Sequence, residues 1–402
     1  MPHDINLIAI LVAAFGLALV LGYLATRLKV PPLVGYLLAG ILIGPTTPGF
    51  VGDMGLAHQL SEIGVMLLMF GVGLHFSLSD LMAVKRLAIP GAVLQILLST
   101  LLGVGLGLLW DMSAMGAIVF GLSLSVASTV VLLRSLEARD LLLTSEGKVA
   151  VGWLVVEDLV MVLMLVLLPV VADMVGTGHG QEQSVAAASN VWLSLGLTFV
   201  KLAGFVALML IVGKRVLPWV LAKVAQTGSR ELFTLCVIAV ALGTAFFAAA
   251  VFEVSFALGA FFAGMMLRES DLSHRAAEES LPLRDAFAVL FFVSVGMLFD
   301  PLIVLREPVL LLLTVLVVMI GKTLIAAGFV LLSRYSLRTA AVVSVSLAQI
   351  GEFSFILAGM GVAMGLIDQA AYSVILAAAF LSIAFNVALM DGALRFLDRR
   401  EA

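Results

Sequence analysis

Two adjacent carboxylates, Glu157 and Asp158, lie near the middle of a long apolar run from Val149 to Val171. A charge at the centre of a lipid bilayer costs roughly 3 kcal/mol on insertion scales, so acids at that depth are rare and usually functional. The pair therefore predicts an ion-binding or proton-binding site. The alternative is a structural acid that pairs with a buried lysine, and the two roles are compatible.

Neighbouring side chains on a helix point about 100° apart, so Glu157 and Asp158 cannot do the same job. One can face the site while the other faces a different partner. A carboxylate in a partly dry cavity takes up a proton more readily than one in water. It can also bind a hard alkali cation, and competition between the two ligands at a site with alternating access is an antiport mechanism.

Two further apolar segments carry small polar residues and glycine at their centres, a pattern that predicts helices broken at mid-membrane. Free backbone groups at such breaks line a cavity or meet other polar groups, and the half-helix ends supply dipoles and carbonyl oxygens for a cation. Serines that hold neighbouring helices together are the alternative. The residues are Ser123, Ser125, Ser128 and Thr129 in the first segment, and Ser346, Gln349, Gly351, Glu352 and Ser354 in the second.

Lys322 lies near the middle of another apolar segment. It is the natural partner of one of the acids when no cation is bound, and a permanent ion pair is the alternative. Glu352 is either a third acid of the site or a structural partner of Lys322. The five histidines and the single cysteine, Cys236, form no metal-ligand spacing, so no metal beyond an alkali cation is expected.

The segments that carry these residues are membrane spans. The chain has 402 residues, of which 62% are hydrophobic and 12% charged, about half the charged share of a soluble domain. The mean hydropathy is +1.21. A span needs about 20 apolar residues, and dividing the chain at charges and turn residues predicts about thirteen spans in an all-α protein. They are 6–26, 31–45, 58–76, 87–110, 115–134, 147–173, 191–213, 231–250, 254–267, 284–299, 308–333, 338–362 and 369–395.

Loop charges orient these spans. Of the 22 Lys and Arg residues, 19 fall on one side of the predicted membrane. The positive-inside rule makes that side cytoplasmic, with the N-terminus outside and the C-terminus inside. Only Arg306 lies in a loop on the other side, and Lys201 and Lys322 lie within spans. The stretch 268–284, rich in both charges, is expected to be a solvated cytoplasmic loop or a short surface helix.

The chain also repeats itself. Residues 32–40 match 256–264 at a shift of 224, and residues 67–73 match 290–296 at 223, as do residues 123–129 and 346–352. The shift covers seven crossings, so the second copy is inverted, as in many secondary transporters. We expect a first repeat at 1–190 (spans 1–6), a connector helix 7 and cytoplasmic loop at 191–230, and a second repeat at 231–402 (spans 8–13).

The whole chain resembles the Kef-type branch of the monovalent cation:proton antiporters, in its subgroup with a Glu-Asp pair. The motifs that carry the resemblance are Val34-Gly-Tyr-Leu-Leu-Ala-Gly40 with Gly44-Pro45, Glu62-Ile-Gly-Val, Ala127-Ser-Thr129, Glu157-Asp158, Phe291-Phe-Val-Ser-Val-Gly-Met297 and Gln349-Ile-Gly-Glu-Phe353. The resemblance implies a core domain that moves against a dimerisation domain, with Asp158 as the carrier of the cation or proton. It implies that Lys322 is the core lysine that pairs with the acid, and that the protein is a homodimer that exchanges potassium for protons.

Two features depart from that family. Glu157 replaces the Gln or Asn typical of its position, which leaves the preferred ion and the stoichiometry open. Kef-type relatives usually continue into a cytoplasmic nucleotide-binding domain, whereas no such pattern follows Arg399 and Arg400. We therefore expect no cofactor in this chain; NAD(H), another nucleotide or glutathione would be relevant only if a cytoplasmic domain is missing.

The sequence thus predicts a secondary active transporter in a bacterial-type inner membrane that exchanges K⁺, rather than Na⁺, for protons. The expected partners are the two ions, membrane lipid and a second copy of the chain, with no nucleic acid. A ligand-gated potassium channel-like efflux protein on the same fold is the alternative. An enzyme is not expected, because the spans contain no nucleophile–base or metal motif, and an anion symporter would need cationic site residues.

Overall fold

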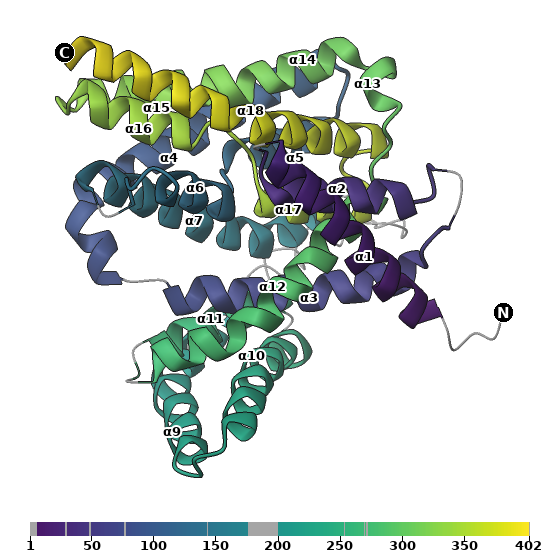
Figure 1. Ribbon diagram of the computed structural model, residues 1–402, viewed down its shortest axis with the longest axis vertical. Helices are drawn as coiled ribbons and strands as arrows, with labels where there is room; N and C mark the ends of the chain where they lie inside the picture. The colour runs from purple at the N-terminus through teal and green to yellow at the C-terminus, as the bar shows by residue number, and fades with distance from the viewer. Residues whose placement is uncertain are drawn as a thin grey trace.

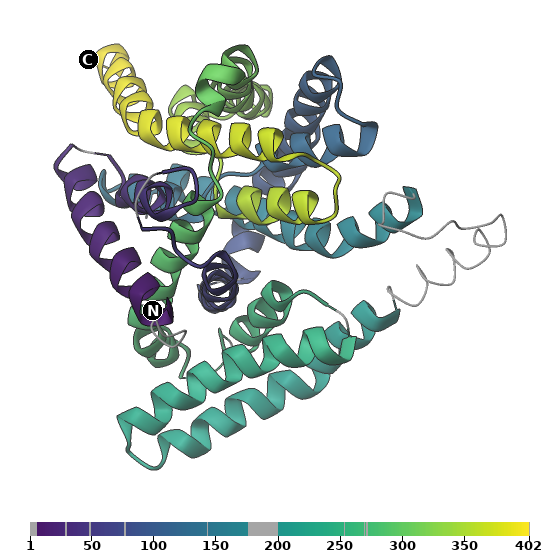
Figure 2. The same cartoon turned by 90° about the vertical axis from the view of Figure 1, so that its right-hand side faces the viewer.

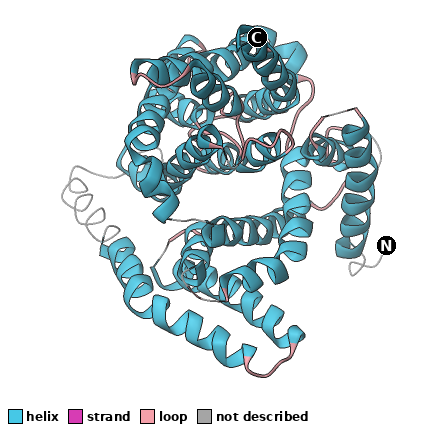
Figure 3. Cartoon of the chain, turned by 60° about the vertical axis from the view of Figure 1, so that its left-hand side comes forward, coloured by secondary structure: helices cyan, strands magenta, loops and turns pink. Residues whose placement is uncertain are grey.

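The computed structural model describes residues 6–28, 30–47, 50–75, 78–142, 144–175, 200–252, 254–268, 270 and 272–401. Within these ranges all regular structure is helical (Figure 3). The helices are α1 (Asn6–Arg27), α2 (Pro32–Ile43), α3 (Met54–His75), α4 (Leu78–Leu109), α5 (Ala114–Ser125), α6 (Thr129–Glu137), α7 (Ser145–Val175), the π-turn η3 (Met209–Gly213), α9 (Lys214–Ala225), α10 (Arg230–Phe252), α11 (Phe256–Arg268), α12 (Ser273–Met297), α13 (Ile303–Arg306), α14 (Pro308–Leu316), the π-turn η4 (Val317–Gly321), α15 (Lys322–Leu332), α16 (Leu337–Ser346), α17 (Glu352–Ala363) and α18 (Gln369–Glu401).

These helices confirm the predicted fold class. Nine helices of the described chain are long and apolar enough to cross a membrane, and five further apolar helices are shorter. Three of these five form the two predicted broken spans: α5 pairs with the still shorter α6, and α16 pairs with α17. The seventh span appears as the helix Val200–Ala225, and the part of its prediction over 191–199 lies outside the described residues.

Three predicted boundaries differ from the structure by nine residues or more: α4 begins at Leu78 and not at 87, α12 begins at Ser273 and not at 284, and the seventh span ends at Ala225 and not at 213. Within the charged stretch 268–284, residues 273–284 belong to α12, so the helical alternative holds there and not the loop. Charged residues of this part of α12 pack on α10: Arg230 Nε lies 2.9 Å from the Glu279 carboxylate, and the guanidinium of Arg275 lies 4.2 Å from the centre of the Phe233 ring. Contacts with a neighbouring helix therefore keep a polar sequence helical here.

The seventh span also continues beyond its predicted end at residue 213, as α9, to Ala225. The apolar side chains of α9 follow the helical spacing i, i+3, i+4 and i+7, which gives the helix one face for packing. Leu217, Val220, Leu221 and Val224 contact the core through that face. The lysines and arginine of this segment therefore belong to an amphipathic helix and not to a loop.

The internal repeat is present in the helices themselves. Each helix of the first copy has a counterpart about 223 residues later; for example, α6 begins at Thr129 and α17 at Glu352. In the same order, α1, α2 and α3 correspond to α10, α11 and α12, and α4 to the helix made of α14, η4 and α15. Likewise α5 corresponds to α16 and α7 to α18, so seven crossings separate equivalent helices.

The helices pack as two bundles, each built from both repeats. One bundle contains α1–α3 and α9–α12, and the other contains α4–α7 and α14–α18. In Figures 1 and 2 the helices α9, α10 and α11 lie at the opposite side of the molecule from α14, α15 and α18. We call the second bundle the core bundle, because it carries the acidic pair and both broken helices.

Equivalent glycines allow the first bundle to pack closely. A Cβ on Gly296 of α12 would lie 3.0 Å from the Cα of Gly40 on α2, and a Cβ on Gly264 of α11 would lie 3.0 Å from the carbonyl carbon of Gly73 on α3. Gly40 and Gly264 are equivalent in the repeat, as are Gly73 and Gly296. Small residues let membrane helices approach backbone to backbone, so the two copies make the same contact twice.

Candidate functional site

The breaks in the two interrupted helices meet inside the core bundle. After α5 ends, Val126 has an extended backbone (φ −111°, ψ 140°), and α6 starts three residues later. Residues 347–351 likewise separate α16 from α17. The side-chain amide of Gln349 joins the breaks: it accepts a hydrogen bond from the Ser128 N–H at 2.9 Å and donates one to the Ser128 carbonyl at 3.2 Å.

Glycine at position 351 lets the two breaks approach this closely. A Cβ on Gly351 would meet the Cα, the Cβ and the backbone nitrogen of Ser128, at distances that real side chains do not reach. Any larger residue would push the two segments apart. The glycine is therefore required by the crossing itself and not by a left-handed backbone, since its φ is −134°.

Glu157 on α7 has partners for both of its carboxylate oxygens. Gln95 Nε2, on α4, donates to Oε1 at 2.6 Å, and the backbone N–H of Ala127, in the first break, donates to Oε2 at 2.9 Å. Gln95 Nε2 also lies 3.4 Å from the carbonyl oxygen of Ser125, at the end of α5. Glu157 therefore ties α4 and α7 to the first break.

Asp158 is only partly satisfied. The hydroxyl of Thr129, the first residue of α6, donates to its Oδ2 at 3.1 Å. The other oxygen, Oδ1, is buried and has no hydrogen-bond partner. The two adjacent acids therefore have different surroundings, as their positions on one helix require.

Lys322 follows directly after the π-turn η4, a helical irregularity that is frequent at functional sites. Its Nζ donates to the backbone carbonyl of Gln349 at 2.9 Å, in the second break. Among the described residues Lys322 forms no direct ion pair, but it interacts electrostatically with Glu157. Lys322 thus donates to a carbonyl that the helix break leaves free, and it also interacts with the Glu157 carboxylate.

Glu352, the first residue of α17, is also buried, and no hydrogen bond of acceptable geometry reaches either of its carboxylate oxygens. Ser128 and Thr129 are its polar neighbours, and its carboxyl group interacts electrostatically with that of Asp158. Glu352 therefore shares its polar and charged neighbours with Asp158. Lys322, in contrast, interacts with Glu157.

The other predicted serines have local roles. The hydroxyls of Ser123 and Ser125 donate to carbonyls of their own helix, at 2.8 Å to Val119 and 2.7 Å to Leu122. The hydroxyl of Ser128 accepts from the Val131 N–H at 3.3 Å and so caps the start of α6. The structure therefore brings Ser128 and Thr129 to the acids through the break, while the hydroxyls of Ser123 and Ser125 bond within α5.

Gln95 is a residue that the sequence interpretation missed. It is fully buried and donates the shortest hydrogen bond to Glu157. A single amide inside the apolar run 87–110 was the available signal, since buried polar side chains in membrane spans are rare and usually have partners. The sequence could not show which partner it had.

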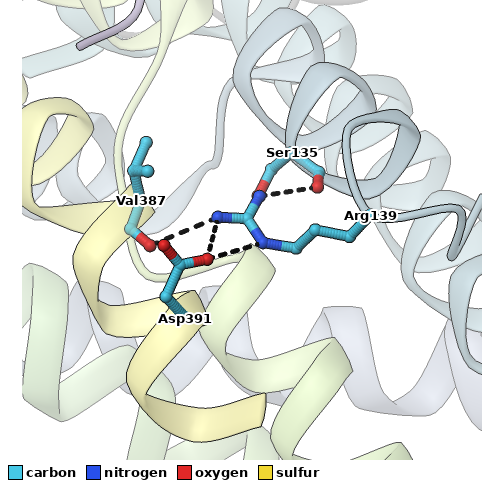
Figure 4. Close-up of polar contacts among 4 residues, drawn as sticks. All are labelled: Ser135, Arg139, Val387 and Asp391. Carbon is cyan, nitrogen blue, oxygen red and sulfur yellow. Dashed lines mark hydrogen bonds and ion pairs between the residues drawn. The ribbon is translucent and has the colours of Figure 1, made fainter. Parts of the chain in front are cut away.

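The second half of the first broken helix is anchored by Arg139, which follows α6 (Figure 4). The guanidinium donates to Asp391 Oδ1 of α18 through Nε at 3.0 Å and through Nη2 at 2.6 Å. It also donates to the carbonyls of Ser135 at 2.8 Å and Val387 at 3.3 Å. A single side chain therefore joins the end of α6 to the last helix of the second repeat.

The arrangement as a whole is suited to a cation. The charged side chains buried in the described part of the chain are three carboxylates and one ammonium, namely Glu157, Asp158, Glu352 and Lys322. Buried charges need a partner of opposite sign, so this cluster has more negative charge than its lysine can balance. Among the described residues, no three or more His, Cys, Asp or Glu side chains are grouped so that they could hold a metal ion.

Comparisons with known proteins agree with this geometry. A family model described as "Sodium/hydrogen exchanger, transmembrane" matches residues 15–390. The "Putative cation/proton antiporter YbaL" of Escherichia coli is 56% identical over 401 residues, covering 100% of this chain and 71% of that protein. The "K(+) efflux antiporter 6" of Arabidopsis thaliana is 34% identical over 356 residues, covering 88% of this chain and 58% of that protein.

The fold also matches a solved structure. The sodium proton antiporter MjNhaP1 from Methanocaldococcus jannaschii, determined at pH 8, superposes with a TM-score of 0.69 at 17% sequence identity. The match covers 96% of this chain and 98% of that chain. At this level of identity the similarity establishes the fold alone.

Proposed function

Because the chain belongs to the sodium/hydrogen exchanger family, which is a family of transporters, we propose that it exchanges a monovalent cation for protons by alternating access. The observation that carries the proposal is the buried excess of carboxylates at the crossing of two broken helices. Such a cluster is stable when a cation or protons compensate it. A site that holds one or the other, but not both at once, couples the two fluxes.

We assign the carrier role to Asp158. Its Oδ1 is free of hydrogen bonds and its Oδ2 receives one from Thr129, so the carboxylate is held in place yet open to a ligand. Ser128 and Thr129 form the adjacent break. Glu157 and Lys322 are fixed charges that stabilise the two breaks. Glu157 accepts a hydrogen bond from Ala127 in the first break, and Lys322 donates one to Gln349 in the second.

Potassium is the cation we propose. Several relatives that are 33–34% identical to this chain are named K(+) efflux antiporters. The family name and MjNhaP1 refer to sodium instead, so Na⁺ is the competing cation in the test below.

The two helix bundles suggest how access alternates. The core bundle contains the site residues, and the bundle of α1–α3 and α9–α12 packs closely at its repeated glycine contacts. We propose that the core bundle moves against a more rigid partner bundle, which exposes Asp158 to one side of the membrane at a time. We further propose a homodimer in a bacterial-type inner membrane, with the N-terminus outside and the C-terminus in the cytoplasm.

The test uses purified protein in liposomes that contain a trapped pH dye. With the interior acidic and the voltage clamped by an ionophore, KCl or NaCl is added outside. We expect proton efflux on cation addition, more with K⁺ than with Na⁺, and no efflux with Asp158→Asn, because an amide cannot exchange a proton. Asp398→Asn, an exposed aspartate on α18, is the matched control and should behave as the wild type.

Two outcomes contradict the proposal. Full activity of Asp158→Asn would remove the carrier assignment. Cation flux without proton movement in the wild type would indicate a channel on the same fold. Glu157→Gln should keep the exchange, because Glu157 is a fixed charge and not the carrier, and the same dye assay records this.

A further inference from the structure

We propose that Asp158 and Glu352 bind the transported cation together, one carboxylate from each repeat, and that Glu157 is not a ligand of the cation. This inference rests on the proposed exchange function and goes beyond it, because it names the second acid of the site. It also assigns different roles to the two adjacent acids of α7: Asp158 binds the cation, and Glu157 is structural.

Among the described residues, three carboxylate oxygens are buried without a hydrogen bond of acceptable geometry: Oδ1 of Asp158 and both Oε1 and Oε2 of Glu352, whose polar neighbours are Ser128 and Thr129. The exposed fraction of Asp158 is 4% and that of Glu352 is 1%. Buried polar atoms are nearly always paired, so each exception needs an explanation. Carboxylate oxygens of two neighbouring side chains that are not engaged in well-formed hydrogen bonds are a ligand set that an alkali cation would take.

The two carboxyl groups are close enough to interact electrostatically, and they surround the same short segment. Thr129 donates to Asp158, and Ser128 and Thr129 are the polar neighbours of Glu352. Two like charges placed together in a buried site repel each other. A cation between them, or protons on them, removes that repulsion, and exchange between these ligands is the activity proposed above.

Glu157 differs from these two acids in its hydrogen bonding and in its charged neighbour. Both of its oxygens accept short hydrogen bonds, from Gln95 and from Ala127, and Lys322 balances its charge. A cation would have to displace these donors to bind it. Of the four buried charges, Glu157 and Lys322 therefore neutralise each other, and Asp158 and Glu352 remain to be compensated.

The internal repeat relates the position of Glu352 to a residue of the first copy. Glu352 is the residue equivalent to Thr129 at the shift of 223, so each begins the second half of a broken helix. The positions equivalent to Glu157 and Asp158 are Phe380 and Leu381, which carry no charge. The second repeat thus contributes its acid from the break, whereas the first contributes its acid from α7, and the site lies where the copies meet.

The experiment measures cation binding apart from transport. Thermal unfolding of the detergent-purified protein is followed in KCl and in choline chloride of equal ionic strength. A ligand that binds the folded state raises the melting temperature, so we expect a K⁺-dependent rise in the wild type. We expect Glu352→Gln to lose this rise, and to raise the KM for K⁺ in liposomes by about tenfold, which corresponds to about 1.4 kcal/mol of binding.

Glu146→Gln is the matched control, because it makes the same change in the first turn of α7, where the Glu146 carboxylate accepts a hydrogen bond from the Ser145 hydroxyl. It should keep the wild-type KM and the K⁺-dependent rise. If Glu352→Gln is not recovered folded, Glu352→Asp tests the same point. Aspartate keeps the charge on an arm one methylene shorter, and it should raise the KM while leaving part of the K⁺-dependent rise.

A Glu352 variant with the wild-type KM and the full K⁺-dependent rise would overturn the inference. The proposed function would survive that result if wild-type exchange is observed and Asp158→Asn abolishes it. If the wild type itself exchanges no cation for protons, the proposed function fails, and the inference fails with it.

Discussion

At the scale of single residues, what distinguishes Glu157 from Asp158 is how completely each is satisfied. The two are neighbours on one helix, and both are buried. Donors from α4 and from the first break bond both carboxylate oxygens of Glu157, whereas Oδ1 of Asp158 has no hydrogen-bond partner. A buried carboxylate with full hydrogen bonding is a structural anion, and one without it needs a ligand. Burial alone would not have separated them.

Gln95→Leu tests the structural role of Glu157. The variant keeps the side chain's bulk but removes the closest donor to a buried carboxylate, which costs about 1–3 kcal/mol. We expect a lower melting temperature in detergent and slower exchange in liposomes. Gln226→Leu, at an exposed position after α9, is the control for the same substitution and should change neither. Equal stability of the two variants would show that Glu157 does not depend on Gln95.

At the scale of elements, the broken helices provide the site and also join its parts. Gln349 pairs with the backbone of Ser128, Lys322 bonds the carbonyl of Gln349, and Glu157 accepts from Ala127. Each contact satisfies a backbone group that a continuous helix would have satisfied internally. The polar residues at the breaks are therefore needed for the fold as well as for the chemistry.

Gly351→Ala should abolish exchange. The new methyl group would collide with the backbone of Ser128, and the collision cannot be relieved by moving a flexible side chain. The separation of the breaks would then disturb Thr129 and Glu352 together. Gly328→Ala on α15 is the matched control: a Cβ there meets nothing within 4 Å, so activity should be kept. Wild-type exchange by Gly351→Ala would show that the breaks do not have to lie this close.

Arg139 holds the end of α6 on α18. Arg139→Ala removes two hydrogen bonds to Asp391 and the bonds to the Ser135 and Val387 carbonyls. Because the Asp391 side chain is nearly half exposed, at 47%, solvent screens the ion pair, and we expect a loss of about 1 kcal/mol. Thermal unfolding of the single variants and of the double variant with Asp391→Ala measures the coupling between the residues. Arg399→Ala, exposed on the same helix, should have no effect.

At the scale of the whole molecule, the inverted repeat places equivalent helices in the same bundle and gives them equivalent contacts. The first three helices of each copy form one bundle together with α9, and α4–α7 and α14–α18 form the core bundle. The repeat is less strict at the site, where an acidic pair on α7 has apolar counterparts on α18. The repeated helices therefore form the scaffold, and the site carboxylates lie at positions where the two copies differ.

This symmetry predicts that Gly40→Ala and Gly264→Ala destabilise the protein to a similar extent. In each case the new methyl group meets a backbone carbonyl of the facing helix, of Val293 or of Phe70. Overpacking of this kind typically costs 1–3 kcal/mol, so we expect about 2 kcal/mol for each variant. Gly243→Ala on α10, with nothing within 4 Å, is the control. Melting temperatures that differ widely between the first two variants would contradict the equivalence.

The sequence by itself determined the membrane spans, the inverted repeat and the positions of the broken helices. These follow from local patterns, since apolar length is set by the bilayer and polar residues at matched depth are visible in the chain. Its errors were at helix ends: α9 continues because one face packs on the core, and α12 starts early because its charges pack on α10. Packing against another helix is not a local pattern.

Only the tertiary structure decided which polar atoms are satisfied. It brought Gln95 to Glu157, directed Lys322 to the carbonyl of Gln349, and left oxygens of Asp158 and Glu352 without well-formed hydrogen bonds. These contacts join residues that lie tens to hundreds of positions apart, and each depends on how two helices cross and rotate. A list of candidate residues can be read from the chain, but their division into structural anions and open ligands depends on hydrogen bonds between helices.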